Sequence, residues 1–420
     1  MQKLLNIDYK KFTLQNGLEV TLYQNKSFPT VAVNLWYKVG SANEVPGKTG
    51  FAHLFEHMMF QGSKHVPKEK HFSYIQEAGG TLNGSTSMDR TNYYETLPSD
   101  SLELALWLES DRMGFLLEAL TQDKLDNQKD VVMNERRQNY DNQPYGLAWE
   151  ILFSNLYPEN HPYHWPTIGW MKDIEQFELN DVKKFFKTYY SPKNASLVIG
   201  GNFSKSNAEQ LVKKYFGEIT NNNEIPQIKF SNPELRKNKK IIHKDNVQLP
   251  RIYLAWHSCK GYAKDDATLD ILADILAGSK NSRLHKRLVH EKQIAQSVSA
   301  FQYSAKLNGS FFIIATAKPE TSLEILKQEI LILLNEIIEK GITENELERA
   351  VNSYKSSFIY SLQNLTTLTN QINNYNCNLN EPNSFVFDIE RYSGLTTADI
   401  KIAAKNYLTE HFVELNIIPK

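Results

Sequence analysis

The segment Phe51–Phe60, FAHLFEHMMF, contains residues whose types and spacing suit metal chemistry. His53 and His57 are four residues apart, so on a helix their imidazoles project from one face, one turn apart. Two imidazoles at this spacing are able to bind one tetrahedral zinc ion. Glu56 lies on nearly the same face, where a carboxylate can accept a proton from a zinc-bound water without being a ligand. The segment therefore predicts zinc bound by His53 and His57, with Glu56 as general base.

The order of these residues, HxxEH, is the reverse of the commoner HExxH and is known as the inverzincin signature. A pattern this short also occurs by chance, and two histidines on an apolar helix are often only packed in a core. The motif alone therefore leaves a metal site and a structural role about equally open.

A zinc site needs a third protein ligand, with water in the fourth place if the site is catalytic. Glu135 follows Val131-Val132-Met133 in a predicted helix, and a carboxylate beside apolar residues is costly unless it is paired or ligated. The residues themselves leave two roles open for Glu135, a zinc ligand and a salt bridge with Arg136 or a nearby arginine. The other candidate ligands are His65, His71, Glu77, Asp89 and Glu95.

Length and composition limit the class of protein. A chain of 420 residues is too long for one ordinary core and suits two or more domains. The hydrophobic fraction of 41% and the charged fraction of 23% are typical of soluble globular proteins. The net charge of −1 gives no support for binding nucleic acid, and no apolar run reaches the roughly 20 residues that a membrane helix requires.

Cys259 and Cys377 are far apart and belong to no CxxC motif, which excludes a disulfide framework and argues against a cysteine zinc site. A single bridge between them stays open. The first residues, MQKLLNIDYKKF, lack the apolar core of a signal peptide, so the sequence as it stands predicts a soluble cytoplasmic protein. A periplasmic or exported location stays open if a signal segment preceded it.

The elements around the motif follow from hydrophobic periodicity. Asn16-Gly17 predicts a hairpin within residues 11–24, and residues 30–39 form an alternating strand. The motif helix spans about 49–60, and the helix with Glu135 spans 120–140. Residues 81–98 form two strands, of which the first is small and polar. It is either a surface edge strand or an edge left open for an extended peptide.

The second half of the chain repeats the order of elements in the first half. A polar stretch ends the first half, and residues 221–240 are the predicted linker. The repeat distance of about 200 residues indicates a duplicated domain. In the second copy the corresponding helix reads Leu269-Asp270-Ile271-Leu272-Ala273 and has no HxxEH. We predict an N-terminal domain over 1–220 with the zinc site and a C-terminal domain over 241–420 without a metal.

HLFEH, followed by DVVMNERR and NQPYG, resembles the pitrilysin/insulinase family of zinc metallopeptidases, which includes the mitochondrial processing peptidase. The resemblance continues through GGTLNGSTSMDRTNYYETLP, HPYHWPTIG and SRLHKRLVHEKQIAQSVSAF, and so covers nearly the whole chain. In that family the third ligand is a glutamate in a pattern like VVxNER. Glu135 stands there, 78 residues after His57. The resemblance thus implies one Zn²⁺ per chain, bound by His53, His57 and Glu135.

The resemblance also implies an α+β fold of two homologous domains. Each is a mostly antiparallel sheet with helices packed on one face, and together they form a half-shell. Two half-shells close around a chamber, so a chain of this length implies a second chain. Peptide substrate would lie along the strand with Asn83, Gly84, Ser85 and Thr86, with Asn83 near the scissile bond. Many members carry a glutamate at the position of Gln128. That glutamate does not bind the zinc directly, so its replacement by glutamine should not remove zinc.

A second departure lies in the C-terminal half. Active members carry an arginine and a tyrosine in a pattern like LVREKGLAYSV, where both contact substrate. Here the segment reads LVHEKQIAQSV, with His290 and Gln296 at those positions. When an enzyme loses one side chain that donates a hydrogen bond to the negatively charged oxygen of the reaction intermediate, the catalytic rate typically falls by a factor of roughly 10²–10³. We therefore predict a heterodimer in which a partner chain supplies the Arg/Tyr pair. A homodimer in which His290 and Gln296, or Tyr303, serve instead is the alternative.

The expected function is a zinc-dependent endopeptidase that hydrolyses peptides or unfolded segments inside a chamber. A non-catalytic scaffold member of the family is the second reading, disfavoured because His53, Glu56, His57 and Glu135 are all kept. A redox iron site is the third, because two histidines and one carboxylate also bind iron.

Overall fold

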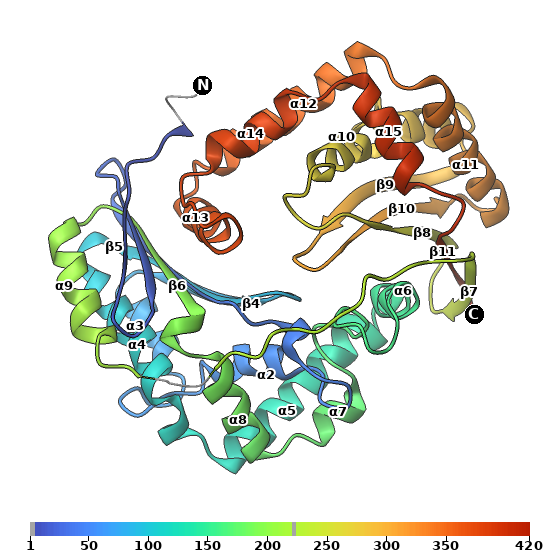
Figure 1. Ribbon diagram of the computed structural model, residues 1–420. Coiled ribbons are helices and arrows are strands. Elements are labelled where there is room, and N and C mark those ends of the chain that lie inside the picture. The colour runs from blue at the N-terminus through green and yellow to red at the C-terminus, as the bar shows by residue number, and fades with distance from the viewer. Residues whose placement is uncertain (1–4, 221–223) are drawn as a thin grey trace. The chain divides into compact units, whose positions relative to one another are not determined.

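The computed structural model, which describes residues 5–220 and 224–420, folds the chain around two β-sheets (Figure 1). Each sheet belongs to one compact unit, and each unit draws on three segments of the chain. Unit 1 consists of 1–136, 165–229 and 359–386, and unit 2 consists of 137–164, 230–358 and 387–420. The chain passes from unit 1 to unit 2 at residues 136–137, 229–230 and 386–387. The second of these passages lies within the predicted linker 221–240, of which residues 221–223 lie outside the described part.

The sheet of unit 1 has six strands in the order β1-β2-β6-β3-β5-β4. Only β2 and β6 run parallel, and the other neighbours are antiparallel. The predicted hairpin is the β1–β2 pair, in which Gly17 has a φ of 90°, a value that glycine adopts without strain. The strands are β1 Lys10–Thr13, β2 Glu19–Gln24, β3 Thr30–Tyr37, β4 Thr81–Thr86, β5 Thr91–Pro98 and β6 Ala195–Gly201.

Helices cover both faces of this sheet. The HxxEH helix α2 packs on one face, and α13 packs on the other, where Asn373 Nδ2 donates to the Asn34 carbonyl at 2.8 Å. The resemblance implied helices packed on one face, and α13 is an addition on the second face; because β6 is buried along its whole length, that face also needs a cover. The helices are α2 Phe51–Met58, α3 Lys70–Glu77, α4 Leu102–Ala119, α5 Gln122–Arg136, α7 Met171–Glu175, α8 Leu179–Tyr189, α9 Lys205–Phe216 and α13 Leu365–Leu379, with short turns η1 Ser41–Asn43, η2 Ser99–Ser101 and η4 Pro192–Asn194.

The sheet of unit 2 has five strands in the order β7-β11-β8-β10-β9, with α10 packed on one face. On the other face lies α6, whose Trp149 ring meets the Phe312 ring edge to face at 5.1 Å. The elements are β7 Lys239–Asp245, β8 Arg251–Ser258, β9 Ala295–Ser304, β10 Gly309–Ala317, β11 Val413–Pro419, α6 Ala148–Leu156, α10 Asp266–Ala277, α11 Leu323–Lys340, α12 Glu344–Ser361, α14 Phe385–Ser393 and α15 Thr397–Tyr407, with π-helical η3 Arg137–Asp141 and η5 His285–Glu291.

The two sheets share one topology. Taken in chain order, strands β2 to β6 of unit 1 and β7 to β11 of unit 2 occupy the same places, and the first and last strand of each set run parallel. This identity confirms the predicted duplication. The units also exchange helices along the sequence, because α6 precedes the linker yet covers the sheet of unit 2, whereas α13 follows it and covers the sheet of unit 1.

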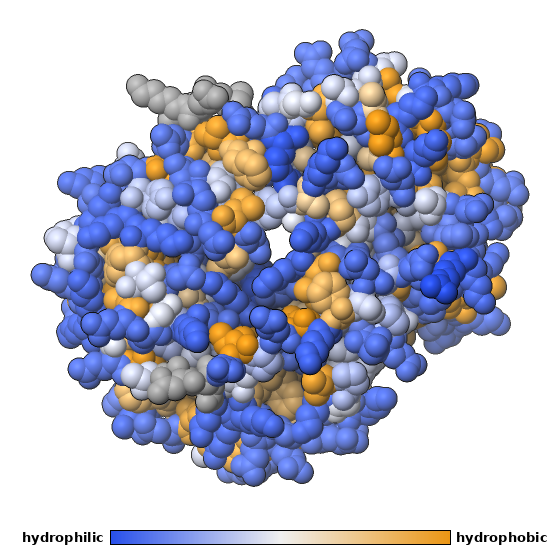
Figure 2. All heavy atoms as spheres, viewed as in Figure 1, coloured by the Kyte–Doolittle hydropathy of each residue, from blue (hydrophilic) through white to orange (hydrophobic). Residues whose placement is uncertain are grey.

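The surface of the molecule gives little indication of its function. On the face drawn in Figure 2, hydrophobic residues form small separate groups among hydrophilic ones. Within the described part of the chain, no helix combines the length and hydropathy that crossing a bilayer demands. No disulfide joins Cys259 to Cys377.

Helix α10, which takes the place of α2 in unit 2, carries a carboxyl group with an altered pKa. Burial raises the pKa of Asp270 to about 7, and Tyr392 donates its hydroxyl proton to Asp270 Oδ2 at 2.7 Å. Because an unfolded aspartate has a pKa near ~3.9, the native state retains a proton that the unfolded state releases between about pH 4 and 7. The free energy of unfolding should therefore fall as the pH rises through this range.

Asp270→Asn should remove this part of the pH dependence and make the protein more stable than the wild type at pH 8, since the amide oxygen still accepts from Tyr392. Urea unfolding at pH 5 and pH 8 measures the effect. Glu348→Gln, an exposed change in the same unit, is the control and should follow the wild type. Equal pH dependence in wild type and Asp270→Asn would contradict the assignment.

Candidate metal centre

Helix α2 is oriented by aromatic packing on one side. The Phe51 ring stacks on Phe177 at 3.9 Å, and the Phe55 ring stacks on Tyr190 at 5.0 Å. Both contacts lie on the buried face of the helix. Since residues three and four apart share a face, His53, Glu56 and His57 are directed away from this packing.

Two buried carboxylates fix the start of α2. Glu44 accepts hydrogen bonds from the backbone N–H groups of Gly50 at 2.9 Å and Ala52 at 2.8 Å. Asp173 accepts from the backbone N–H and the hydroxyl of Thr49 at 3.1 and 2.7 Å. These N–H groups have no partner inside the helix, so the carboxylates satisfy them. Burial raises the pKa of Glu44 to about 8, and its two backbone donors act against that rise. Neither residue was predicted, because Glu44 belongs to a loop without periodicity and Asp173 is 124 residues from Thr49 in the sequence.

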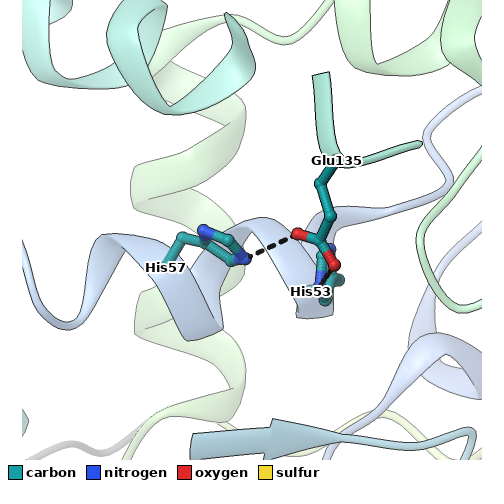
Figure 3. A group of neighbouring side chains, drawn as sticks. All are labelled: His53, His57 and Glu135. Carbon is teal, nitrogen blue, oxygen red and sulfur yellow. Dashed lines mark ion pairs between the residues drawn. The ribbon is translucent and has the colours of Figure 1, made fainter. Parts of the chain in front are cut away.

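The side chains of His53, His57 and Glu135 converge between α2 and α5 (Figure 3). His57 Nε2 is 3.3 Å from Glu135 Oε2, and His53 Nε2 is 3.7 Å from Glu135 Oε1. One ligand atom from each residue lies within 4.8 Å of the other two. Ligands about 2.1 Å from a tetrahedral zinc are about 3.4 Å apart, so the donors fit zinc in type and in spacing.

The protonation and exposure of these groups also suit a metal. Burial, with a further contribution from His57, lowers the pKa of His53 to about 4, although Glu135 acts in the opposite direction. His53 is therefore neutral at pH 7 and has a lone pair to donate. The side chains of His57 and Glu135 are 24% and 32% exposed, so water reaches the group.

Other residues considered for this site have contacts of their own. Arg136, the proposed salt-bridge partner of Glu135, donates to the Gly169 carbonyl at 3.0 Å. His65 contacts Asp111, and the His71 ring packs against Phe60. Among the described residues, His53, His57 and Glu135 are the one group of three potential ligands at metal-binding spacing.

Glu56 is positioned by the edge strand β4. Thr86 Oγ1 donates to Glu56 Oε2 at 2.6 Å. Burial raises the pKa of Glu56, and the bond from Thr86 lowers it. At Gly84 a Cβ atom would lie 3.0 Å from Glu56 Cγ, so glycine leaves room for the carboxylate. Gly84 and Thr86 therefore support the candidate base directly.

Strand β4 is the last strand of its sheet, and among the described residues it pairs with β5 alone. The Ser87 N–H donates to the Arg90 carbonyl at 2.8 Å, so these two residues form a hydrogen-bonded pair. Along an antiparallel ladder such pairs alternate with pairs whose backbone groups do not bond to each other, and every second residue of β4 belongs to the latter kind. The backbone groups of Leu82, Gly84 and Thr86 therefore point to the open edge. The side chains of Asn83 and Ser85 lie on the face opposite α2, where Ser85 Oγ donates to Asn92 Oδ1 at 2.6 Å.

Thr86→Val should lower kcat by about tenfold, because a hydrogen bond to a charged group contributes about 1.5–3 kcal/mol and here orients the base. The KM for peptide should change little, since the backbone of residue 86 is unaltered. Thr86→Ser, which keeps the hydroxyl, is the control and should retain most of the wild-type kcat. Steady-state cleavage of a quenched fluorescent peptide gives both constants; equal loss in the two variants would argue against a positioning role.

Three further predicted residues lie in other segments of the sequence or do not contribute a ligand. His290 lies in the last turn of the π-helical segment η5 of unit 2, with its ring 4.9 Å from that of His285, and Gln296 lies on β9. Both side chains are exposed. Gln128 is buried on α5, one helical repeat before Glu135, and its amide donates to Asn127 Oδ1 at 2.9 Å.

Comparison with known proteins places the chain in a family. Residues 19–164 match the family model described as "Insulinase (Peptidase family M16)", and residues 176–354 match that described as "Peptidase M16 inactive domain". The chain is 34% identical to the zinc protease PqqE of Helicobacter pylori over 84% of this chain and 80% of that protein. It is 23% identical to a probable mitochondrial-processing peptidase subunit beta of Arabidopsis thaliana, over 86% and 68% of the two chains.

The structural comparison agrees. The fold superimposes on the crystal structure of a protease from Helicobacter pylori with a TM-score of 0.92 and 30% identity, covering 99% of this chain and 100% of that chain. Family models match both halves of the sequence, and one relative, covered over most of its length, is more than 30% identical to this chain. The chain therefore belongs to the insulinase family, peptidase family M16.

Proposed function

We propose that this chain is a zinc-dependent endopeptidase. One observation carries the proposal: His53, His57 and Glu135 converge at zinc-ligand spacing, with Glu56 on the same helix face. The names of the relatives as zinc proteases support the same class of reaction. A scaffold role would not require all four residues to be kept in this arrangement.

In the proposed reaction Glu56 accepts a proton from the attacking water and later delivers it to the leaving amine. Thr86 holds the Glu56 carboxylate in place during both transfers. His53, His57 and Glu135 would hold the metal. When bound, zinc lowers the pKa of a coordinated water to about 7 and polarises a carbonyl oxygen.

The substrate in this proposal adds to the open edge of β4 as an extended strand. The outward backbone groups of Leu82 and Thr86 and the Gly84 carbonyl would pair with it, so affinity would depend mainly on main-chain hydrogen bonds. Such pairing places the substrate backbone beside Gly84, where the absence of a side chain leaves Glu56 accessible. Peptides and unfolded segments fit this mode, whereas a folded protein offers few extended segments.

We further propose that a second chain completes the enzyme. His290 and Gln296 replace the arginine and tyrosine implied by the family resemblance, and similarity to a protein named as a subunit accords with a two-chain assembly. In a heterodimer the partner would supply the Arg/Tyr pair. A homodimer that relies on His290 and Gln296 is the alternative.

The test is cleavage of a quenched, unstructured fluorescent peptide by the purified chain after its zinc content has been measured. Cleavage that stops with a chelator and returns with zinc supports the peptidase and favours the self-sufficient form. One zinc per chain without cleavage would direct the search to a partner of similar length that has the Arg/Tyr pair. A chain that takes up no zinc, alone or with such a partner, would contradict the proposal.

A further inference from the structure

A polar pocket opens beside the free edge of β4, on the face of the unit 1 sheet opposite α2. Its volume is about 240 Å³, far more than the roughly 10–15 Å³ that one water molecule requires. All of its lining belongs to unit 1: three residues of β4, two of β5 and one of α13. They are Thr81, Leu82, Asn83, Tyr94, Thr96 and Thr366.

The lining is rich in hydrogen-bonding groups and has no charged side chain. The hydroxyl groups of Thr96 and Thr366 are 2.9 Å apart and form a hydrogen bond. Asn83 Oδ1 accepts from the Gly84 N–H at 2.9 Å, which leaves the Asn83 NH2 group to donate. A charged side chain would find no counter-charge in the lining, and an aliphatic one would leave these groups without water or a partner.

The position of the pocket links it to the substrate strand of the proposed function, on which this inference rests. Residues directly opposite each other on antiparallel strands share a face, and faces alternate along each strand. A substrate residue opposite Gly84 therefore points toward α2 and Glu56. Its neighbour, opposite Asn83, points to the other face, where the pocket lies.

We propose that this pocket is a specificity subsite that binds an uncharged hydrogen-bonding side chain of the substrate. The occupant would be serine, threonine, asparagine or glutamine at the substrate position opposite Asn83. Thr366 makes the subsite depend on α13, so a segment from the C-terminal part of the sequence would influence the choice of cleavage site.

Peptides in which two residue types alternate can test the subsite by binding, and the test does not require the register of the peptide on β4. In fluorescein-labelled (Thr-Ala)n and (Val-Ala)n peptides with lysine tails, every second side chain lies on one face, so registers two residues apart place the same residue type at the pocket. A register shifted by one residue places alanine there in both peptides, so a difference in affinity reports on threonine against valine. Threonine and valine have nearly the same shape and differ in the hydroxyl group. Fluorescence anisotropy with the full chain carrying Glu56→Gln, which prevents cleavage, should show about tenfold tighter binding of the threonine peptide.

Thr366→Val should reduce this ratio toward one, whereas Thr367→Val should leave it unchanged. Thr367 is the neighbouring residue, is exposed and does not line the pocket, and is therefore a matched control. Circular dichroism checks that both variants are folded. Equal affinity for the two peptides in the parent chain, or a ratio that Thr366→Val leaves intact, would overturn the subsite.

Zinc-dependent cleavage by the chain with native Glu56, measured in parallel, separates the subsite from the proposed function. A binding preference without cleavage would support the subsite while counting against the peptidase. Cleavage with no binding of either peptide would overturn the subsite together with strand addition at β4, and would leave the peptidase standing.

Discussion

Replacing Glu56 with glutamine is expected to leave one zinc ion bound per chain and to lower peptide cleavage by about 10²–10⁴-fold. Glutamine has nearly the same shape and still accepts a hydrogen bond from Thr86, so the structure around it should persist. It cannot accept a proton from water, so the attack on the peptide bond loses its base. Zinc analysis and single-turnover cleavage, in the chain alone or with its partner, measure the two properties.

The control for this variant is Glu118→Gln, which makes the same chemical change at an exposed glutamate on α4. It should cleave at the wild-type rate. Turnover near the wild-type value in Glu56→Gln would exclude Glu56 as the base. Loss of zinc from Glu56→Gln would instead show that Glu56 belongs to the ligand set.

Replacing Glu135 with glutamine should weaken zinc binding by more than about 100-fold, since changes to residues that only support a ligand already cost 10–100-fold. The two Glu135 oxygens face His53 and His57, and an amide is a poor substitute for a carboxylate as a zinc ligand. Cleavage should fall in proportion to zinc occupancy and recover partly with excess zinc. Competition with a chromophoric chelator gives the affinity.

Asp130→Asn removes an exposed carboxylate from the same helix, α5, and is the control for general charge effects. It should bind zinc as the wild type does. If Glu135→Gln binds zinc equally well, Glu135 is not the third ligand. A thermal melt of each variant without metal distinguishes loss of a ligand from loss of the fold.

Much of the fold around the motif could be predicted because apolar periodicity dominates there. The alternating segment 30–39 forms β3, and the motif helix forms α2 over Phe51–Met58. The duplication was also visible, because the second half repeats the order of elements even where its residues differ. For the strand and the helix, the pattern within a single segment was enough to assign it.

No helix was predicted over the residues of α13, where asparagines and threonines surround the buried stripe of Leu365, Leu368, Ile372 and Tyr375. Asn370 Oδ1 accepts from the Trp36 indole N–H at 3.1 Å, and Asn376 Nδ2 donates to Ser196 Oγ at 2.9 Å. Asparagine is a weak helix former, so its spacing carried no helical signal. The reciprocal placement of α6 and α13 was equally hidden, because it depends on contacts between segments far apart in the sequence: α6 contacts β8 and β11, and α13 contacts β3 and β6.

Within the candidate site, the helical spacing of His53, Glu56 and His57 was sufficient to group these three residues. The sequence around Glu135 did not decide between a zinc ligand and a salt-bridge partner. The family resemblance identified it as the ligand. Glu44 and Asp173, which fix the start of α2, stand in segments without periodicity. Their contacts arise only when the chain is folded.

The proposed peptidase depends on one zinc ion bound by His53, His57 and Glu135. Anomalous diffraction at the zinc absorption edge, from crystals of the full chain prepared with zinc, tests this most directly. We predict one anomalous peak per chain, at ligand distance from His53 Nε2, His57 Nε2 and a Glu135 oxygen. A strong peak at other residues, or none in crystals grown with excess zinc, would contradict the metal centre and with it the proposed peptidase.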